Sequence, residues 1–314
     1  MDGNLHMIKD AEPSSLRAAP ERFVLKVPAG AGVEDKDATI AGWHFPGPKQ
    51  DPMVFCHANG FCASTYRQIL TDLASHYDIY ALDLRGHGRT TLTADPTAHR
   101  GWKVYADDLV LAIDALREKH GIAGEITVAG HSLGGGAAIL AASQLADVRE
   151  VKVIEPVFMP MFFRWMAKTP VWPLIAKQIP IVKGALKRRS SWPSLDDVKA
   201  RYASKPLFAR WHNGVLDDYL KDGLTNEANG SVRLACSPLW EAANFANHKH
   251  DLARAILALD VPVSILTANH SSSTAPKSVR ARLRKSGLKI EEIDNASHLA
   301  PLEDPTACAA FLRA

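Results

Sequence analysis

The stretch AGHSLGG at residues 129–135 places Ser132 between two glycines, Gly130 and Gly134. A β-branched run, EITV, precedes it and a run of helix formers, GGAAILAASQLA, follows it. A very tight turn between strand and helix strains its central residue, and neighbours without side chains let the two elements approach. The pattern G-x-S-x-G in this context is typical of a nucleophile elbow that exposes a serine hydroxyl at a helix N-terminus. The alternative is a simple turn or a phosphate-binding turn.

Short apolar runs alternate with helical patterns on both sides of this turn, and a predicted hairpin precedes them. Strands separated by helices at this spacing form parallel βαβ units, with helices on both faces of the sheet. We therefore expect an α/β fold with a mostly parallel, doubly wound sheet of about eight strands. The expected strands include the hairpin at 22–28 and 38–46, and the runs at 53–56, 78–82, 125–130, 151–157, 261–268 and 288–294.

The alternation stops after Pro156 and resumes near residue 236. The intervening segment is rich in proline, tryptophan and methionine, with helical patches but no clear strand. We interpret residues 156–235 as a mainly helical cap inserted after the sixth strand. Residues 1–155 and 236–314 then form the core.

The composition narrows the class of protein. The 314 residues are 46% hydrophobic and 23% charged, which is ordinary for a soluble globular protein. A formal net charge of +3 with interleaved signs argues against a nucleic-acid partner. The basic cluster KRR at 187–189 is interpreted as a solvated helix end.

The four cysteines show neither metal-ligand spacing nor the density of a disulfide framework, so we expect free buried thiols, no metal and no cofactor. Cys56 and Cys62 flank a loop, and their approach to one another is the alternative. The chain shows no secretory signal and no apolar stretch that spans a bilayer, so a cytoplasmic location is expected. The sequence leaves the oligomeric state open.

Four separated signatures follow expected strands: HANGF at 57–61, DLRGHG at 83–88, GHSLGG at 130–135 and SHLAPLEDP at 297–305. With these signatures in order, the chain resembles the α/β-hydrolase family over roughly residues 21–155 and 240–314. In open α/β sheets, reactive groups collect at the carboxyl ends of the strands, where the signatures lie. The resemblance implies a serine hydrolase with a Ser–acid–His triad.

The resemblance assigns roles to individual residues. Ser132 is the expected nucleophile and His298, in the last loop before the C-terminal helix, is the expected general base. The expected oxyanion hole consists of the backbone N–H groups of Asn59 and Leu133. Ala58 departs from the family, which usually has glycine there. His57 and His87 are expected to hold loops in shape.

The position of the acidic member of the triad departs from the commonest family pattern. Family members usually have an aspartate after the strand that here reads VPVSILTA, but NHSSST follows it, without a carboxylate. Glu155, at the end of the preceding strand, keeps the order nucleophile, acid, base. The alternative for Glu155 is a salt bridge to an arginine such as Arg164. Asp294 and Asp304 are weaker candidates for the acid.

The aromatic residues of the expected cap suggest which type of substrate binds. Phe162, Trp165 and Trp211 are candidates for lining its underside, although such aromatic residues more often form a small core of their own. We expect hydrolysis of small to medium, largely apolar carboxylic esters through an acyl-enzyme. Lactone, thioester, amide or C–C bond hydrolysis, or a non-catalytic ligand-binding role, are the alternatives. An alternative for the segment 157–168 is that it contacts a lipid surface.

Overall fold

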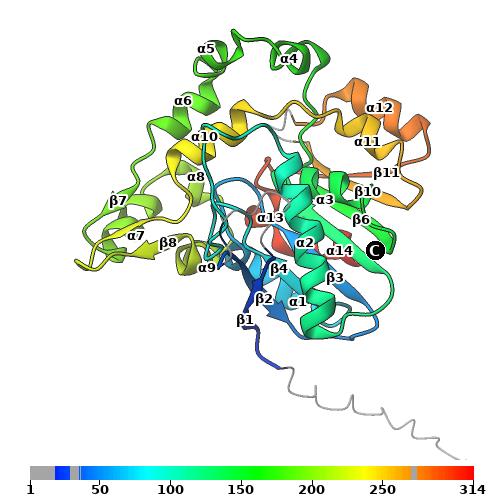
Figure 1. Cartoon of the computed structure of the whole chain (residues 1–314), viewed down its shortest axis with the longest axis horizontal. Helices are drawn as coiled ribbons and strands as arrows, with labels where there is room; N and C mark the ends of the chain where they lie inside the picture. Colours follow the sequence, from blue (N-terminus) through cyan, green and yellow to red (C-terminus); the bar gives the residue numbers. More distant parts are fainter. Residues whose placement is uncertain (1–17, 29–34, 36, 270–273) are drawn as a thin grey trace, which may run out of the picture.

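An eight-stranded sheet forms the centre of the protein, in the order β1-β2-β4-β3-β5-β6-β10-β11 (Figure 1). The computed structural model describes residues 18–28, 35, 37–269 and 274–314. The strands of the sheet are β1 (Glu21–Lys26), β2 (Thr39–Phe45), β3 (Pro52–Cys56), β4 (Asp78–Leu82), β5 (Ile126–His131), β6 (Val148–Ile154), β10 (Val263–Ala268) and β11 (Lys289–Ile293).

The pairing confirms the predicted fold class. β1 and β2 form the antiparallel hairpin, β2 pairs antiparallel with β4, and the remaining neighbours in the sheet are parallel. Every residue of β3, β4 and β5 is buried, as expected for central strands that are covered on both faces. The carboxyl ends of β3, β5, β6 and β10 therefore meet at one edge.

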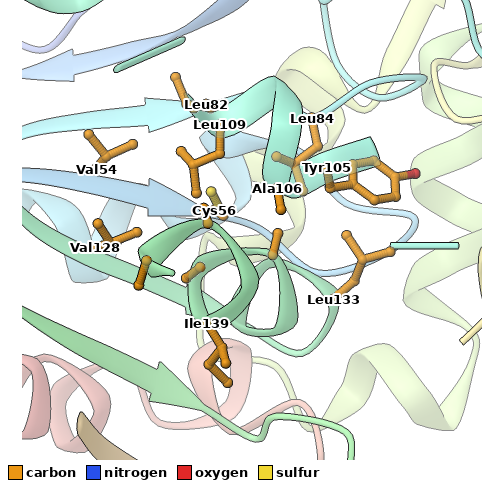
Figure 2. Close-up of a cluster of buried hydrophobic side chains, with 14 of the residues drawn as sticks. Val54, Cys56, Leu82, Leu84, Tyr105, Ala106, Leu109, Val128, Leu133 and Ile139 are labelled. Carbon is orange, nitrogen blue, oxygen red and sulfur yellow. The ribbon is translucent and has the colours of Figure 1, made fainter. Parts of the chain in front are cut away.

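Helices cover the two faces of the sheet and create two apolar clusters. One cluster includes residues of α2 (Lys103–His120), α3 (Leu133–Ala142), α11 (Leu252–Ile256) and α12 (Lys277–Lys285). The other includes residues of a 3₁₀ turn, η1 (Ala63–Tyr66), and of α1 (Arg67–Leu73), α13 (Ala300–Glu303) and α14 (Pro305–Arg313). Figure 2 shows the first cluster, in which Val54, Cys56, Leu82 and Val128 of the strands lie near Leu109, Leu133 and Ile139 of α2 and α3.

Two glycines around Ser132 permit a close approach of α3 to the sheet. A Cβ on Gly134 would lie 2.2 Å from the carbonyl oxygen of Cys56, and one on Gly130 would lie 2.5 Å from the carbonyl carbon of Gly134. Neither position has room for a side chain. The first turn of α3 consequently packs directly against the loop that follows β3.

The segment between β6 and α10 (Pro238–Ala246) is fully described and is mainly helical. It also holds a three-stranded antiparallel sheet, in the order β7-β9-β8, so the expectation of no strand there was wrong. Strands of two or three residues are too short to show a period in the sequence. The assignment of residues 156–235 as a separate cap stays a prediction. The elements are α4 (Met161–Met166), α5 (Trp172–Ala176), α6 (Pro180–Leu186), β7 (Ser191–Trp192), α7 (Leu195–Ala203), α8 (Pro206–Ala209), α9 (Val215–Asp222), β8 (Leu224–Asn226) and β9 (Val232–Leu234).

The four cysteines, Cys56, Cys62, Cys236 and Cys308, are free and buried, which confirms the expected thiols. Burial raises the pKa of the Cys56 and Cys62 thiols to about 12. Among the described residues, no helix has both the length and the apolar character needed to cross a membrane.

Candidate active site

Ser132, His298 and Glu155 form a continuous line of hydrogen bonds. The Ser132 hydroxyl lies 2.9 Å from His298 Nε2, and His298 Nδ1 lies 3.0 Å from Glu155 Oε2. Since a carboxylate can only accept, Nδ1 carries the proton that is donated to Glu155 and Nε2 is left to accept from the serine. This tautomer is the one in which an imidazole can take a proton from a hydroxyl.

The backbone conformation at both strand ends places these side chains. Ser132, after β5, has φ 55° and ψ −113°, and Glu155, after β6, has φ 51°. Non-glycine residues seldom adopt positive φ, and such strain is concentrated at functional sites. His298 is in the loop between β11 and α13, and its side chain is 32% exposed.

Glu155 is fully buried and is held by more than the histidine. Its Oε1 accepts a hydrogen bond of 2.6 Å from the backbone N–H of Ala268, and its Oε2 accepts one of 2.9 Å from the hydroxyl of Thr274. These donors fix the orientation of the carboxylate and compensate for its burial. The acid thus hydrogen-bonds to the end of β10, the strand after which the family usually has its aspartate.

The other partners considered for this acid lie elsewhere. Arg164 forms an ion pair with Asp251, so the salt bridge to Glu155 is not present. Asp294 accepts a hydrogen bond from the side chain of Asn269, and Asp304 caps α14 through the N–H of Ala307. Residues 270–273, within the segment NHSSST, lie outside the described residues.

The two expected oxyanion donors lie on elements that touch. Asn59 follows β3, and Leu133 is the first residue of α3, which packs against that loop through Gly134. Within the described part of the chain, neither backbone N–H donates a hydrogen bond to a protein acceptor. The side chain of Asn59 is fixed separately, since its amide group donates to the carbonyl of Glu241 and its oxygen accepts from Asn244.

His57 and His87 tie the loops after β3 and β4 together. Nε2 of His57 accepts from the N–H of Leu84 (2.9 Å), and Nε2 of His87 accepts from the N–H of Gly60 (3.0 Å). Burial lowers the pKa of His57 well below its usual value and that of His87 to about 4, so both rings are neutral near pH 7. These contacts agree with the structural role expected for both residues.

Sequence reasoning missed a chain of hydrogen bonds through Tyr66 and His131. The N–H of Ala58 donates to the Tyr66 hydroxyl (3.1 Å), which lies 2.7 Å from Nδ1 of His131. Nε2 of His131 in turn lies 2.8 Å from the carbonyl oxygen of His298. Burial lowers the pKa of His131 to about 3, which keeps its ring neutral, with Nε2–H as donor.

This chain connects three parts of the site: the loop before Asn59, the residue before Ser132, and the backbone of His298. The available signal was the histidine in the variable position of G-x-S-x-G. A polar ring at the end of a buried strand requires partners. Tyr66, however, is distant in sequence, and no pattern pointed to it.

The three aromatic residues proposed to line the cap differ in their surroundings. Phe162 and Trp165, both on α4, are each 64% exposed, so they do not line an enclosed pocket here. Trp211 is buried, and its ring centroid lies 5.8 Å from that of Phe61, in the loop that carries Asn59. Of the three, Trp211 is the one that packs beside the site.

The residues described by the structure contain no group of three or more histidine, cysteine or acidic side chains arranged to hold a metal ion. The polar groups around Ser132 instead form the hydrogen-bonded line given above.

A model of the Alpha/beta hydrolase family matches residues 53–311. The chain belongs to this family. Protein phosphatase methylesterase 1 of Schizosaccharomyces pombe is 30% identical over 116 residues, a match that covers 35% of this chain and 33% of that protein. The matched part thus spans about a third of the length of this relative.

Solved structures share the fold at low identity. The E-2-(acetamidomethylene)succinate hydrolase superposes with a TM-score of 0.72 at 18% identity, covering 94% of this chain and 98% of that one. The peroxisomal alpha-beta-hydrolase Lpx1 of Saccharomyces cerevisiae gives 0.71 at 18% identity, covering 95% and 88%. Their likeness shows that the α/β-hydrolase fold extends over nearly the whole chain.

Proposed function

We propose that the protein is a serine hydrolase that cleaves carboxylic esters of small to medium, largely apolar substrates through an acyl-enzyme. The single observation that carries the proposal is the line Ser132–His298–Glu155, with both hydrogen bonds at about 3 Å and the acid fully buried. A serine hydroxyl needs a neutral imidazole to accept its proton as it attacks. The family membership and the methylesterase relative support hydrolytic chemistry.

In the proposed mechanism, Ser132 Oγ bonds to the carbonyl carbon of the ester while His298 Nε2 takes the hydroxyl proton. The carbonyl oxygen becomes an oxyanion, stabilised by the N–H groups of Asn59 and Leu133. Collapse breaks the bond to the alcohol oxygen, which receives the proton from His298. Water then attacks the acyl-serine with His298 as base, and the acid is released. Glu155 stabilises the imidazolium in both halves.

Lactone, thioester, amide and C–C bond hydrolysis use the same serine chemistry and are the alternatives within this class. A non-catalytic ligand-binding role is the alternative outside it, and the intact hydrogen-bonded line argues against that role. Four free, buried thiols favour a reducing compartment, and we place the enzyme in the cytoplasm. Its proposed partner is a small-molecule ester, without nucleic acid, metal or cofactor.

A fluorophosphonate probe tests the proposal directly, because it labels only an activated serine. Labelling of the wild type and its loss in Ser132→Ala, with unchanged circular dichroism, is the expected result. A series of p-nitrophenyl esters of increasing acyl length then identifies the preferred acyl group. Absence of labelling in a folded wild type would favour the non-catalytic alternative.

A further inference from the structure

Three successive helices of the segment after β6, namely α4, α5 and α6, lie at the outer edge of the molecule (Figure 1). They expose large apolar side chains. Met161 is 77% exposed, Leu174 71% and Ile181 53%. Single exposed apolar residues are ordinary, but a concentration of them on neighbouring helices marks a surface for a partner or a membrane. The exposed set, which we call the apolar rim, is Met161, Phe162, Phe163, Trp165, Val171, Leu174, Ile175, Ile181 and Leu186.

The same stretch carries only positive charge. Residues 156–195 contain no aspartate or glutamate. Arg164 pairs with Asp251 and Arg188 pairs with Glu241, while the other cations of this stretch have no ion pair within the described part of the chain. A surface that is both apolar and cationic is complementary to anionic groups that overlie an apolar layer. The cations are Arg164, Lys168, Lys177, Lys183, Lys187, Arg188 and Arg189.

A small cavity continues this surface beyond α6. It has a volume of about 280 Å³ and includes Gly184, one helical turn after the exposed Ile181 and therefore on the same side of the helix. Its lining includes the cluster KRR at 187–189 and holds no acidic residue. The lining consists of Gly184, Lys187, Arg188, Arg189, Trp192, Arg201, Tyr202 and Lys205.

Arg188 of this cavity is paired with Glu241, whereas Lys187, Arg189, Arg201 and Lys205 have no ion pair among the described residues. Burial, followed by the charges of Arg201 and Arg188, lowers the pKa of Lys205. The indole N–H of Trp192, a residue that is 2% exposed, has no acceptor among the residues that the structure describes. A phosphate group would supply the negative charge that the unpaired cations of the cavity lack.

We propose that this face of the protein docks on a membrane of anionic phospholipid, with the apolar rim in the interface and a headgroup phosphate in the basic cavity. The apolar rim and most of the cavity lining belong to the stretch from α4 to β7, and the remaining cavity residues, Arg201, Tyr202 and Lys205, come from α7 and the turn after it. Apolar burial and attraction to anionic lipid reinforce one another in such interfacial binding. The proposal does not depend on the ester hydrolysis proposed above.

Vesicle co-sedimentation tests it with the full chain. Vesicles of phosphatidylcholine with phosphatidylglycerol should retain the wild type at least about tenfold better than phosphatidylcholine alone, and added salt should weaken the binding. Lys187→Gln with Arg201→Gln should reduce binding about tenfold or more. Leu174→Ser with Ile181→Ser should reduce vesicle binding to a similar extent. This reduction should be the same on vesicles with and without phosphatidylglycerol.

A matched control removes the same number of charges from the core. Lys26 and Lys49 are exposed and lie outside the segment, so Lys26→Gln with Lys49→Gln should bind vesicles like the wild type. All variants should hydrolyse a soluble short ester at the wild-type rate, which separates membrane docking from catalysis. Equal losses in the control and the cavity variant would overturn the proposal. Binding of inorganic phosphate without binding to vesicles would also overturn it. A wild-type dimer in solution that Leu174→Ser with Ile181→Ser disrupts, when neither protein binds vesicles, would overturn it as well.

Discussion

Ser132 and Glu155 directly follow neighbouring parallel strands and have nearly the same positive φ, 55° and 51°. The N–H of Ser132 donates to the carbonyl of Ile154 (3.0 Å), and the N–H of Glu155 donates to that of Leu266 (2.8 Å), so each strand is paired up to the residue that turns. The two residues therefore lie at the same edge of the sheet, separated by about one strand spacing, roughly 5 Å. The ring of His298 bridges that gap.

Glu155→Gln should lower kcat by about four orders of magnitude, as loss of the acid's charge does in serine proteases. The amide oxygen will stay with the N–H of Ala268, which leaves the NH₂ group facing His298 Nδ1. Two donors cannot pair, so the ring will turn to the tautomer with Nε2–H toward Ser132 and lose its ability to accept a proton. Steady-state kinetics on a p-nitrophenyl ester measure the loss.

The control for this change is Asp294→Asn, at the exposed carboxylate that was the alternative acid. Asp294 contacts Asn269, so the substitution Asp294→Asn is expected to leave kcat near that of the wild type. If Asp294→Asn removed turnover while a folded Glu155→Gln enzyme kept it, the acid would be Asp294. A wild-type pH dependence in Glu155→Gln would contradict the proposed role in the same way.

Ser132→Ala should lower kcat by at least about three orders of magnitude while the protein keeps its fold. Alanine removes only the hydroxyl, and the backbone strain at this position is the same in both proteins. The free energy of unfolding should therefore change by about 1 kcal/mol or less. Single-turnover assays with mass spectrometry should detect an acyl adduct in the wild type and none in the variant. Near-normal turnover by Ser132→Ala would refute the mechanism.

The α/β fold class and the candidates Ser132 and Glu155 could be predicted because tight turns and buried strands leave strong local signals, and His298 was chosen by its place in the family pattern. The order of the strands in the sheet was not predicted. Glu155 was singled out by the missing carboxylate after VPVSILTA and by its place at a strand end. The short strands β7, β8 and β9 left no period to detect. The exposure of Phe162 and Trp165 also went unforeseen, because composition cannot distinguish an aromatic residue beneath a cap from one on its outside.

Tyr66→Phe should lower kcat about tenfold or more with a smaller change in KM. The Tyr66 hydroxyl is the link between the N–H of Ala58 and the ring of His131, and Ala58 directly precedes the proposed oxyanion donor Asn59. A loosened donor affects the transition state more than the bound ester. The buried groups left without a partner should also cost about 1–3 kcal/mol in the free energy of unfolding.

Tyr77→Phe separates positioning from general destabilisation. The Tyr77 hydroxyl donates to the carbonyl of Leu312 and accepts from Lys152, away from the site. This variant should lose a comparable free energy of unfolding and keep its kcat. Equal losses of kcat in the two variants would mean that the chain through Tyr66 only stabilises the fold.

Trp211→Ala should lower kcat/KM for octanoyl esters more than for acetyl esters. Trp211 packs on Phe61, beside the loop that carries Asn59, and a short acyl group does not reach it. Trp192→Ala is the matched control, because Trp192 is also buried in the same apolar cluster but contacts Tyr202 instead. Chain-length profiles measure the difference, and parallel losses on all esters would argue against an acyl site at Trp211.

Stability should fall as the solution is acidified below about pH 6.5, and His87 should account for part of the loss. Burial lowers the pKa of this histidine from 6.5 to about 4, so between these values the unfolded chain binds a proton that the folded protein does not. Stability therefore rises with pH through this window and is fully present above the unfolded pKa. Burial also raises the pKa of Asp83 to about 6, which opposes the trend below that pH.

His87→Gln isolates the imidazole from the carboxyl group, because Asp83 contributes equally to both proteins. The wild type should lose about 2 kcal/mol more than the variant between pH 7 and pH 5, since the folded ring resists protonation over that range. At pH 7 the variant should itself be less stable, because Gly60 loses the acceptor that holds its loop. Urea unfolding at the two pH values measures both effects, and equal pH slopes would show that His87 is not held neutral by the fold.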